Sequence, residues 1–525
     1  MTYIFGANII ENVTSGMYQD SKVIYREYIQ NACDQIDKAI NEGILKPGEG
    51  SIDIWLDRDH RSITICDNAT GISSTKFKEV LGNIADSDKK IGENKGFRGI
   101  GRLCGLAYCK ELVFISSAKG ETVESILRCD AKKMRELIAE NGHGIKHTAN
   151  DVLHAINSFD QREHVDSDLH YFRVELTEIN PENTDLLEFQ QVKDYLSFVA
   201  PVPYQSSFIY RKDIYNYAKS KVVKIDEYNI KLGGEQIFKK YVTILKDSQT
   251  GDKYDEIFGV HFHDFIDKNG KLIAWMWVGI SKFQKAIPKI NQMRGLRLRK
   301  ENIQIGGEDA LQKLFKEDRG NSYFIGEVFA IERNLVPNSQ RDYFNENPAR
   351  FEFESELRKY FNDELRKLYY DGSAINSSYK KIDAAKKIEN DFKQKEITGG
   401  FIDSEHRQRE LNLVNESQKG AEKAQGNIEK VKNKAAKNQL MKQVIDRIEV
   451  ERKKDSINKN EPSSLPANQK DDLHKEINTP RRVDKLTRLS KAERKLVSKI
   501  LSIITTSTDS ETAEKIIRRI EEELQ

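Results

Sequence analysis

The architecture of this chain is built around residues 26–38, which read R-E-Y-I-Q-N-A-C-D-Q-I-D-K. Apolar side chains recur there at three- and four-residue steps, the spacing that places them on one face of a helix. These side chains are Ile29, Ala32, Cys33 and Ile36. Glu27, Asn31 and Asp34 fall on an adjoining face, because they also lie one or two turns apart. The stretch therefore predicts a helix with one face in a core and a polar face beside it.

The polar face of this helix carries groups suited to catalysis and metal binding. The carboxylate of Glu27 can polarise a water molecule, and the amide oxygen of Asn31 can ligate a hard cation such as magnesium. Their side chains project towards the same point because one helical turn separates them. The pattern E-x-x-x-N-x-x-D is not specific by itself, since most helix faces of this composition are simply solvated.

Two later stretches supply the features of a phosphate-binding site. Residues 63–66, I-T-I-C, predict a buried strand that runs into a turn at residues 67–72, D-N-A-T-G-I. Residues 95–102, K-G-F-R-G-I-G-R, place three glycines just ahead of an apolar helical run at residues 103–108. Glycine-rich backbone at a helix start leaves N–H groups free to bind phosphate, and the helix dipole favours an anion there.

In this order and spacing, the three elements resemble the GHKL superfamily of ATPases, which is named for gyrase B, the heat-shock protein 90 chaperones, histidine kinases and MutL. The first motif is most similar to the heat-shock protein 90 version. The resemblance implies a Bergerat-type α/β sandwich for the nucleotide domain, with ATP as ligand and Mg²⁺ as cofactor. The fold class expected for the whole chain is α+β.

The resemblance also implies roles for single residues. Glu27 matches the general base that activates the water attacking the γ-phosphate, and Asn31 matches the magnesium ligand. Asp67 matches the aspartate that accepts a hydrogen bond from the adenine amino group, and Gly71 matches the glycine beside the base. Asp34, on the same helix face as Glu27, is expected to contact the nucleotide as well.

The remaining expected phosphate contacts lie in the segment that would form a lid over the nucleotide. Gly96, Gly99 and Gly101 match the family's phosphate-binding loop at the hinge of that lid. Lys89 and Arg98 can screen triphosphate charge when the lid closes, or they can be solvated loop charges.

One position departs from the family pattern D-x-G-x-G, because its first glycine is replaced by Ala69. The added methyl group lies where backbone passes the nucleotide, and alanine disfavours a positive φ. Since Glu27 and Asn31 are both intact, we expect an active but slow ATPase. A nucleotide-dependent scaffold that binds ATP without turnover stays as an alternative because of Ala69.

Composition limits the class of protein. The chain has 525 residues, enough for several domains, and 32% of them are charged. Its 85 basic and 83 acidic residues nearly cancel, so net charge argues neither for nor against nucleic acid. The five cysteines form no C-x-x-C motif, the start lacks a basic and apolar leader, and no apolar run approaches the length of a membrane span. These features predict a soluble cytoplasmic protein with no membrane contact.

The first two of five expected segments are domains with cores. Residues 1–205 form the ATP-binding domain, which ends where Pro201 and Pro203 impose an extended connector. Residues 206–370 form an α+β middle domain, similar to the transducer domain of superfamily members outside the kinases.

The other three expected segments form a C-terminal tail. Residues 371–453 are helical, with a thin heptad seam that fits either a dimer contact or an intramolecular hairpin. Val414, Ala421, Ile428 and Ala435 step by sevens along this seam. Residues 454–485 predict a disordered linker, and residues 486–525 predict a helical hairpin. Two amphipathic helices cannot bury a core alone, so this hairpin is expected to dock on a partner or on a second copy.

Two basic stretches of the middle domain are candidates for phosphate contact. Residues 335–342, L-V-P-N-S-Q-R-D, resemble the heat-shock protein 90 loop whose arginine reaches the γ-phosphate, so Arg341 is a catalytic candidate, with a surface arginine as the alternative. Residues 293–300, M-R-G-L-R-L-R-K, alternate basic and apolar side chains. They predict a strand with one charged face, which is solvated, senses phosphate or contacts nucleic-acid backbone.

Together these inferences predict a nucleotide-gated clamp. ATP would close a homodimer and hydrolysis would reopen it, in a process that involves DNA or defence, as in the MORC and MutL groups that the chain also resembles. A chaperone similar to heat-shock protein 90 is the alternative, favoured by the first motif and the Arg341 loop. The C-terminal helices are expected to contact DNA or an effector or client protein.

Overall fold

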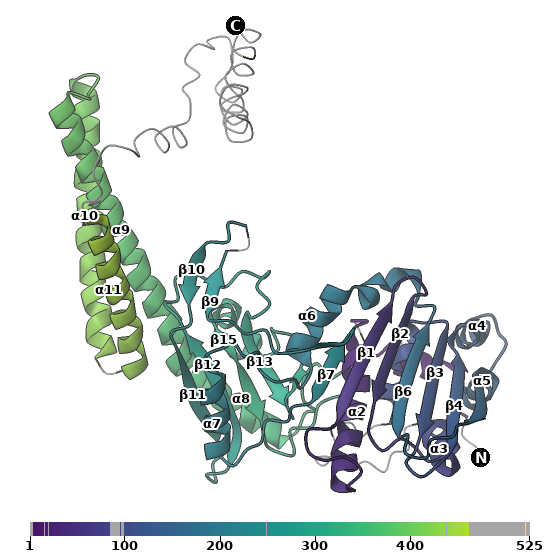
Figure 1. Cartoon of the computed structure of the whole chain (residues 1–525). Coiled ribbons are helices and arrows are strands. Elements are labelled where there is room, and N and C mark those ends of the chain that lie inside the picture. The colour runs from purple at the N-terminus through teal and green to yellow at the C-terminus, as the bar shows by residue number, and fades with distance from the viewer. Residues whose placement is uncertain are drawn as a thin grey trace, which may run out of the picture. The chain divides into compact units, whose positions relative to one another are not determined.

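The computed structural model describes residues 4–460, except residues 15, 19, 85–94, 96–98, 248 and 437, and it also describes residue 520 (Figure 1). The chain divides into two compact units, residues 1–449 and residues 450–525. All three sheets lie in the first unit. The expected fold class, α+β, is confirmed.

Eight strands form the first sheet, in the order β5-β4-β3-β6-β2-β1-β7-β8. Neighbouring strands are antiparallel except β1 and β7, which are parallel. The strands are β1 (Ser51–Asp57), β2 (Ser62–Asp67), β3 (Glu111–Ser117), β4 (Val123–Asp130), β5 (Asn157–Glu163), β6 (Tyr171–Thr177), β7 (Asn229–Leu232) and β8 (Glu235–Gln236).

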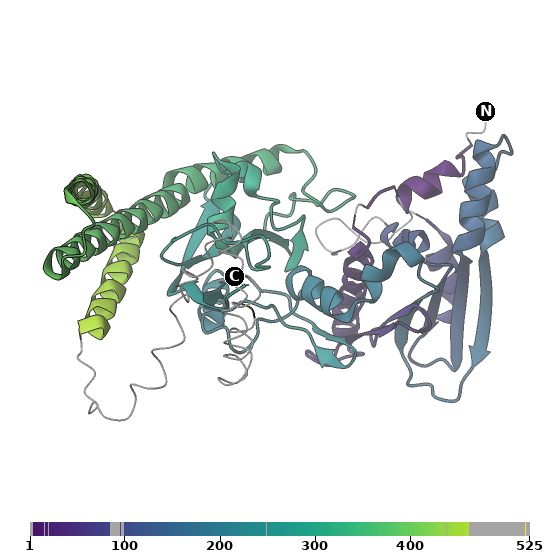
Figure 2. The ribbon, with the colours of Figure 1, turned by 90° about the horizontal axis from the view of Figure 1, so that it is seen from above.

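Helices pack on one face of this sheet (Figure 2). The central one is α2 (Val23–Asn41), whose four predicted apolar side chains are all buried. They share a core with Ile52 and Ile54 of β1, which alternate with more exposed residues along the strand. The other helices are α1 (Asn8–Val13), α3 (Ser74–Gly82), α4 (Ala131–Gly142), α5 (Ala149–Ile156) and α6 (Phe189–Val199), with 3₁₀ segments at Gly101–Ala107 and Pro181–Leu187.

The first sheet extends beyond the boundary expected near residue 205. Helix α6 does end at Val199, just before the two prolines, but β7 and β8 follow the connector and return to the sheet. Ile230 and Leu232 of β7 are buried in the first core. The prolines therefore end a helix without ending the sheet, because a parallel partner for β1 comes from a distant part of the chain.

Five strands form the second sheet, in the order β11-β12-β15-β13-β14. Alternate residues of β12 enter different cores: Met276 and Val278 pack on the side of α8, while Trp275 and Trp277 pack on the side of α7. The elements are α7 (Arg211–Ser220), β11 (Gly259–Ile266), β12 (Leu272–Ile280), β13 (Gly295–Lys300), β14 (Ile303–Ile305), β15 (Ile325–Ala330) and α8 (Pro348–Tyr360), with 3₁₀ segments at Gln312–Leu314 and Asp318–Tyr323. A separate pair consists of β9 (Ile244–Lys246) and β10 (Lys253–Glu256).

Long helices follow the second sheet. A π-helical turn, Phe361–Leu365, joins α8 directly to α9 (Arg366–Thr398), so no break occurs at the boundary expected at residue 370. Helix α9 then packs against α10 (Ser404–Ala435) as an antiparallel hairpin, in which Lys395 Nζ lies 3.1 Å from Glu410 Oε2. Val414 and Ile428 of the predicted heptad seam are buried in α10. The seam is therefore buried within the chain, which agrees with its interpretation as an intramolecular hairpin.

Helix α11 (Gln439–Asn460) continues into the segment that the sequence predicted as a disordered linker. That prediction is wrong for residues 454–460, where proline and glycine are absent and nothing prevents the helix from continuing. The rest of the expected linker and the expected hairpin at 486–525 lie outside the described residues, apart from residue 520. No helix in the described part of the chain is long and apolar enough to cross a membrane.

Candidate functional site

The polar face of α2 holds a carboxylate that is buried but not fully hydrogen-bonded. Glu27 is only 8% exposed, and its Oε1 atom has no hydrogen-bond partner among the described residues. Two guanidinium groups flank this oxygen, with Arg26 Nη2 at 3.5 Å and Arg341 Nε at 3.5 Å. A carboxylate oxygen that no described residue hydrogen-bonds, held next to positive charge, is suited to orienting a water molecule.

The backbone at Gly101 approaches this carboxylate closely. Gly101 begins the 3₁₀ segment in the predicted glycine-rich stretch, and a Cβ atom there would lie 2.4 Å from Glu27 Oε2. Any other residue would have to displace the Glu27 side chain. The sequence motif therefore brings glycine and carboxylate together in the described structure, as a site for a closely packed ligand requires.

The second motif forms a tight turn at the end of β2. Asp67 is buried, which raises its pKa to about 7, although the Ala69 N–H group donates to Asp67 Oδ1 at 3.0 Å and offsets part of that rise. Gly71 has a φ of +65°, and a Cβ atom there would lie 1.9 Å from the Ser117 carbonyl oxygen. Only glycine fits this turn, which leaves the Asp67 carboxyl group at its start.

The departure at Ala69 causes no backbone strain. Ala69 is fully buried, and it is not among the residues with a positive φ. Its carbonyl oxygen lies 2.7 Å from His170 Nδ1. The objection that alanine restricts a positive φ therefore does not apply to this position.

Of the other predicted nucleotide-binding residues, the structure describes Asn31, Asp34 and Gly99. Asn31 is half-buried one turn after Glu27, and Gly99 has a φ of +68°. Asp34 accepts a hydrogen bond from the Lys95 backbone N–H, at 2.8 Å from Oδ1, so it holds the glycine-rich segment. Lys89, Gly96 and Arg98 lie outside the described residues.

Arg341 comes to the same site from the loop after β15, far away in sequence. It is 6% exposed, and its Nη2 atom donates to the Lys95 carbonyl oxygen at 2.6 Å, across 246 residues of chain. Arg26 supports the same loop, because its Nη2 atom donates to the Gln340 carbonyl oxygen at 3.1 Å. Burial lowers the pKa of Arg341, while neighbouring Glu27 acts to raise it. The alternative of a surface arginine is wrong.

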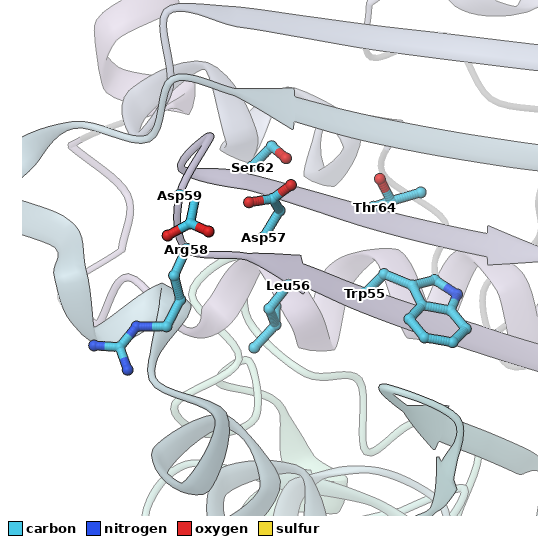
Figure 3. Close-up of a pocket in the computed structure, with 7 residues that line it drawn as sticks. All are labelled: Trp55, Leu56, Asp57, Arg58, Asp59, Ser62 and Thr64. Carbon is cyan, nitrogen blue, oxygen red and sulfur yellow. The ribbon is translucent and has the colours of Figure 1, made fainter.

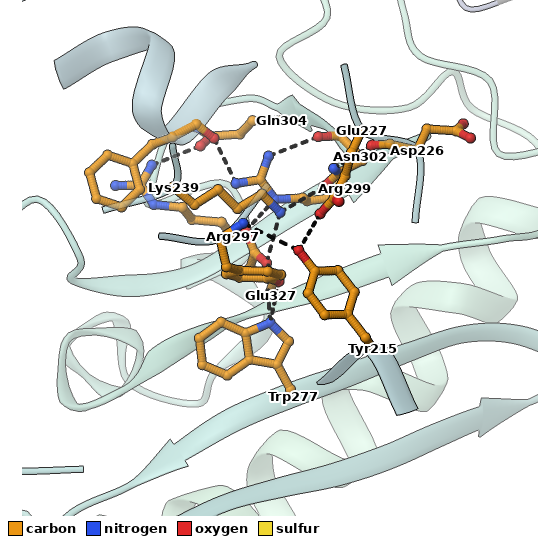
Figure 4. A network of polar contacts seen from close by, with 12 residues as sticks. Tyr215, Asp226, Glu227, Lys239, Trp277, Arg297, Arg299, Asn302, Gln304 and Glu327 are labelled. Atoms are coloured by element: carbon orange, nitrogen blue, oxygen red, sulfur yellow. Dashed lines mark hydrogen bonds and ion pairs between the residues drawn. The ribbon is translucent and has the colours of Figure 1, made fainter. Parts of the chain in front are cut away.

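The second basic stretch, by contrast, lies in the interior. β13 runs between β15 and β14, and all six of its residues are buried, Arg299 fully. The interpretations of this strand as a solvated face or a nucleic-acid contact are therefore wrong, whereas its interpretation as a phosphate sensor stays a prediction. Arg297 donates to Gln304 Oε1 at 2.8 Å, and Arg299 pairs with Glu327 (Figure 4).

Glu327 is the centre of a buried network that the sequence did not reveal. Its carboxylate is fully buried and accepts hydrogen bonds from Arg299, from Tyr204, from Lys239 Nζ at 3.2 Å and from Trp277 Nε1 at 3.1 Å (Figure 4). The one available signal was a glutamate alone in the apolar run of residues 323–331. A buried charge must find partners, so this glutamate implied cations elsewhere in the fold.

A hollow of about 580 Å³ lies at the β1–β2 hairpin (Figure 3). Its lining consists of Trp55, Leu56, Asp57, Arg58, Asp59, Ser62 and Thr64. It contains none of the predicted site residues.

Residues 20–165 match the protein family described as "Histidine kinase-, DNA gyrase B-, and HSP90-like ATPase". Curated relatives include proteins named "Chaperone protein HtpG". The Psychrobacter arcticus protein is 26% identical over 175 residues, which are 30% of this chain and 27% of the relative. The Acinetobacter baylyi protein is 36% identical over 90 residues, which are 16% of this chain and 14% of the relative. The chain thus spans about a quarter or less of these relatives. The GHKL superfamily predicted from the three motifs is confirmed for residues 20–165.

Proposed function

We propose, on the premise that residues 20–165 are an ATPase domain of the GHKL superfamily, that this chain binds ATP and hydrolyses it slowly, with Glu27 as general base. The observation that carries the proposal is the nearly buried Glu27 carboxylate, whose Oε1 has no hydrogen bond from any described residue and lies 3.5 Å from Arg341 of a distant loop. A purely structural carboxylate at this depth would be fully hydrogen-bonded.

The described residues fit a nucleotide. Asp67 accepts a hydrogen bond from the adenine amino group, and Gly71 lies beside the base. Gly99 and Gly101 let backbone approach the phosphates, and the absence of a side chain at Gly101 also leaves the Glu27 carboxylate in place. Asn31 would hold Mg²⁺ through its amide oxygen, and a bound Mg²⁺ neutralises phosphate charge. Lys89, Gly96 and Arg98 are proposed to complete the phosphate contacts.

Two groups of the chain act on the reacting atoms. Glu27 orients a water molecule and accepts its proton while the water attacks the γ-phosphate. Arg341 donates to the γ-phosphate oxygens, where its guanidinium group stabilises the charge of the transition state. Since Arg341 belongs to the loop after β15, turnover requires that this loop and α2 stay together.

We propose further that the ATPase drives a homodimeric clamp in the cytoplasm. The names of the curated relatives favour a protein client, as for a chaperone, over DNA as the clamped partner. DNA stays the second candidate, because the MORC and MutL groups share the nucleotide motifs. The alternative without turnover, a nucleotide-dependent scaffold, is opposed by the unstrained backbone at Ala69.

Steady-state ATP hydrolysis tests the proposal. We expect slow turnover in the wild-type protein and a loss of about 100-fold or more in Glu27→Ala and Glu27→Gln, with ADP binding retained. Glu42→Gln, an exposed carboxylate just after α2, is the matched control and should leave turnover unchanged. Stimulation by an unfolded protein supports the chaperone, and stimulation by DNA supports the other candidate. ATP binding without phosphate release in the wild type would leave only the scaffold.

A further inference from the structure

We propose that Lys95 and Asp226 form a positioning ion pair, which holds the Arg341 loop at the nucleotide site and connects that loop to the second sheet. The inference rests on the proposed function, because the placement of Arg341 affects turnover only if Arg341 acts on ATP. Lys95 and Asp226 themselves touch no reacting atom in this proposal. They act through the backbone that they hold in place.

The Lys95 side chain is enclosed by acidic groups from two parts of the chain. It is 8% exposed, and its Nζ atom lies 2.7 Å from Asp37 Oδ2 and 3.5 Å from Asp226 Oδ2. The Tyr228 ring covers it at 5.3 Å, while the Tyr228 hydroxyl donates to Asp37 Oδ2 at 2.7 Å. Burial lowers the pKa of Lys95, but the two carboxylates outweigh it and raise the pKa overall. The ammonium group therefore stays charged and paired, and it does not serve as a phosphate ligand.

The backbone of Lys95 joins the two halves of the proposed catalytic machinery. Its N–H group donates to Asp34 Oδ1 at 2.8 Å, on the face of α2 that carries Glu27. Its carbonyl oxygen accepts a hydrogen bond from Arg341 Nη2 at 2.6 Å. A displacement of the Lys95 side chain would move this peptide, and the guanidinium group of Arg341 would move with it.

Asp226 lies between Lys95 and the second sheet. Its backbone carbonyl oxygen accepts a hydrogen bond from Asn302 Nδ2 at 2.6 Å (Figure 4). Asn302 belongs to the turn between β13 and β14, in which Glu301 and Asn302 both have a positive φ. The same Asn302 side chain accepts from Lys239 Nζ at 2.7 Å, and Lys239 pairs with Glu327. Contacts therefore run without a gap from the buried Glu327 network to the carbonyl group that binds Arg341.

The pair is more than a surface ion pair, because the Lys95 head group is almost completely buried. Removing one carboxylate from a buried cation leaves charge that is poorly compensated, whereas exposed pairs contribute little. Asp226 also pairs with Lys224, whose Nζ atom lies 3.3 Å from Asp226 Oδ1 but whose side chain is 80% exposed. Lys95→Met and Lys224→Met therefore remove cations from the same aspartate and form a matched pair of variants.

The first experiment needs no nucleotide. Hydrogen exchange is measured on a peptide that covers residues 336–343 in the full chain, for the wild type, Asp226→Asn, Lys95→Met and Lys224→Met. The loop amides are held by local bonds such as Arg341 N to Asn338 O, 3.1 Å. We expect these amides to exchange about 10-fold faster in Asp226→Asn and Lys95→Met, and at the wild-type rate in Lys224→Met. Equal exchange in all four proteins would overturn the inference.

The second experiment measures coupling in turnover, since contact alone does not establish it. Asp226→Asn and Lys95→Met should lower kcat about 10-fold with KM little changed, and Lys95→Arg should restore most of it. In an Arg341→Lys background, Asp226→Asn should have little further effect, because both changes act through one guanidinium group. Additive losses would overturn the inference. A wild-type protein without turnover would refute the proposed function, and the hydrogen-exchange result would then decide on the ion pair by itself.

Discussion

Two buried glutamates, Glu27 and Glu327, each lie between two cations, but their surroundings differ. Glu327 is saturated: Arg299, Lys239, Tyr204 and Trp277 all donate to it. Burial acts to raise the pKa of Glu327, but Arg299 and Lys239 outweigh burial and bring the pKa to about 2. At Glu27, the two guanidinium groups stop at 3.5 Å, and one carboxylate oxygen has no hydrogen bond among the described residues.

This difference distinguishes a carboxylate that stabilises the fold from one that is suited to catalysis. A fully hydrogen-bonded buried charge is costly to disturb, so it fixes the strands that carry its partners. A buried carboxylate oxygen without a hydrogen bond has lost water contacts on folding and has gained no hydrogen-bond donor in exchange. Such an oxygen can bind a water molecule or respond to a ligand. We therefore expect Glu327 to determine stability and Glu27 to determine turnover.

The largest expected effect is on the free energy of unfolding, and it should differ between variants of the two glutamates. Glu327→Gln leaves Arg299 and Lys239 buried without a carboxylate, which should lower the free energy of unfolding by about 3–5 kcal/mol. Glu27→Gln removes the carboxylate between Arg26 and Arg341 but breaks no hydrogen bond that a described residue makes to Oε1, so the loss should be smaller, about 1–2 kcal/mol. Urea unfolding, followed by fluorescence of the buried tryptophans, measures both. Similar losses in the two variants would contradict the distinction.

The next effect concerns the arginines of the two sites. Arg341→Lys keeps the charge but loses the planar guanidinium group, so kcat should fall about 100-fold, equivalent to about 2–3 kcal/mol, with stability almost unchanged. Arg299→Lys, the matched change beside Glu327, should instead lower stability and leave kcat of the folded protein near the wild-type value. Steady-state kinetics and urea unfolding of both variants test this. A stability loss in Arg341→Lys equal to that of Arg299→Lys would show that Arg341 is structural.

A smaller effect is expected from the glycine that approaches Glu27. The methyl group of Gly101→Ala would lie 2.4 Å from Glu27 Oε2 and must push the carboxylate aside. Displacement of a general base by a fraction of an ångström should lower kcat by about 10- to 30-fold, while ADP binding changes little. Gly82→Ala, where nothing lies within 4 Å of the added methyl group, is the control. Unchanged kcat in Gly101→Ala would mean that Glu27 has room to move.

The sequence predicted site residues that lie within short motifs, but it could not predict which distant segments pair with one another. The motifs located Glu27, Asp67, Gly71 and Gly101, because helix spacing and turn geometry fix these positions over a few residues. The likeness of the loop at residues 335–342 also pointed to Arg341.

The misplaced features of the two large sheets depend on long-range contacts. The alternation in β13 predicted one exposed face, but it could not reveal that Leu296 and Leu298 enter a core on one face while Arg299 pairs with buried Glu327. Likewise, no local pattern indicated that β7 pairs with β1, or that Lys95 pairs with Asp226. Such partners are specified only by the completed fold.

Asp67 provides the smallest expected effect and a third kind of buried carboxylate. No cation in the described part of the chain compensates it, and its backbone hydrogen bond from Ala69 leaves its pKa raised by burial to about 7. Below pH 7, the nucleotide-free protein therefore holds a proton on Asp67, whereas the adenine amino group, a hydrogen-bond donor, favours the ionised form. Binding must release that proton, so ADP affinity should rise with pH by at most about 10-fold between pH 6 and pH 8, and then level off.

Calorimetry of ADP binding in two buffers with different ionisation enthalpies measures the released proton directly. Asp67→Asn has no proton to release, while the phosphates of ADP titrate identically in both proteins, so the difference between the two proteins isolates Asp67. We expect about half a proton more released by the wild type at pH 7. Equal proton release would mean that the Asp67 carboxyl group is already ionised in the free protein, and that burial without a cation does not distinguish it from Glu27 and Glu327.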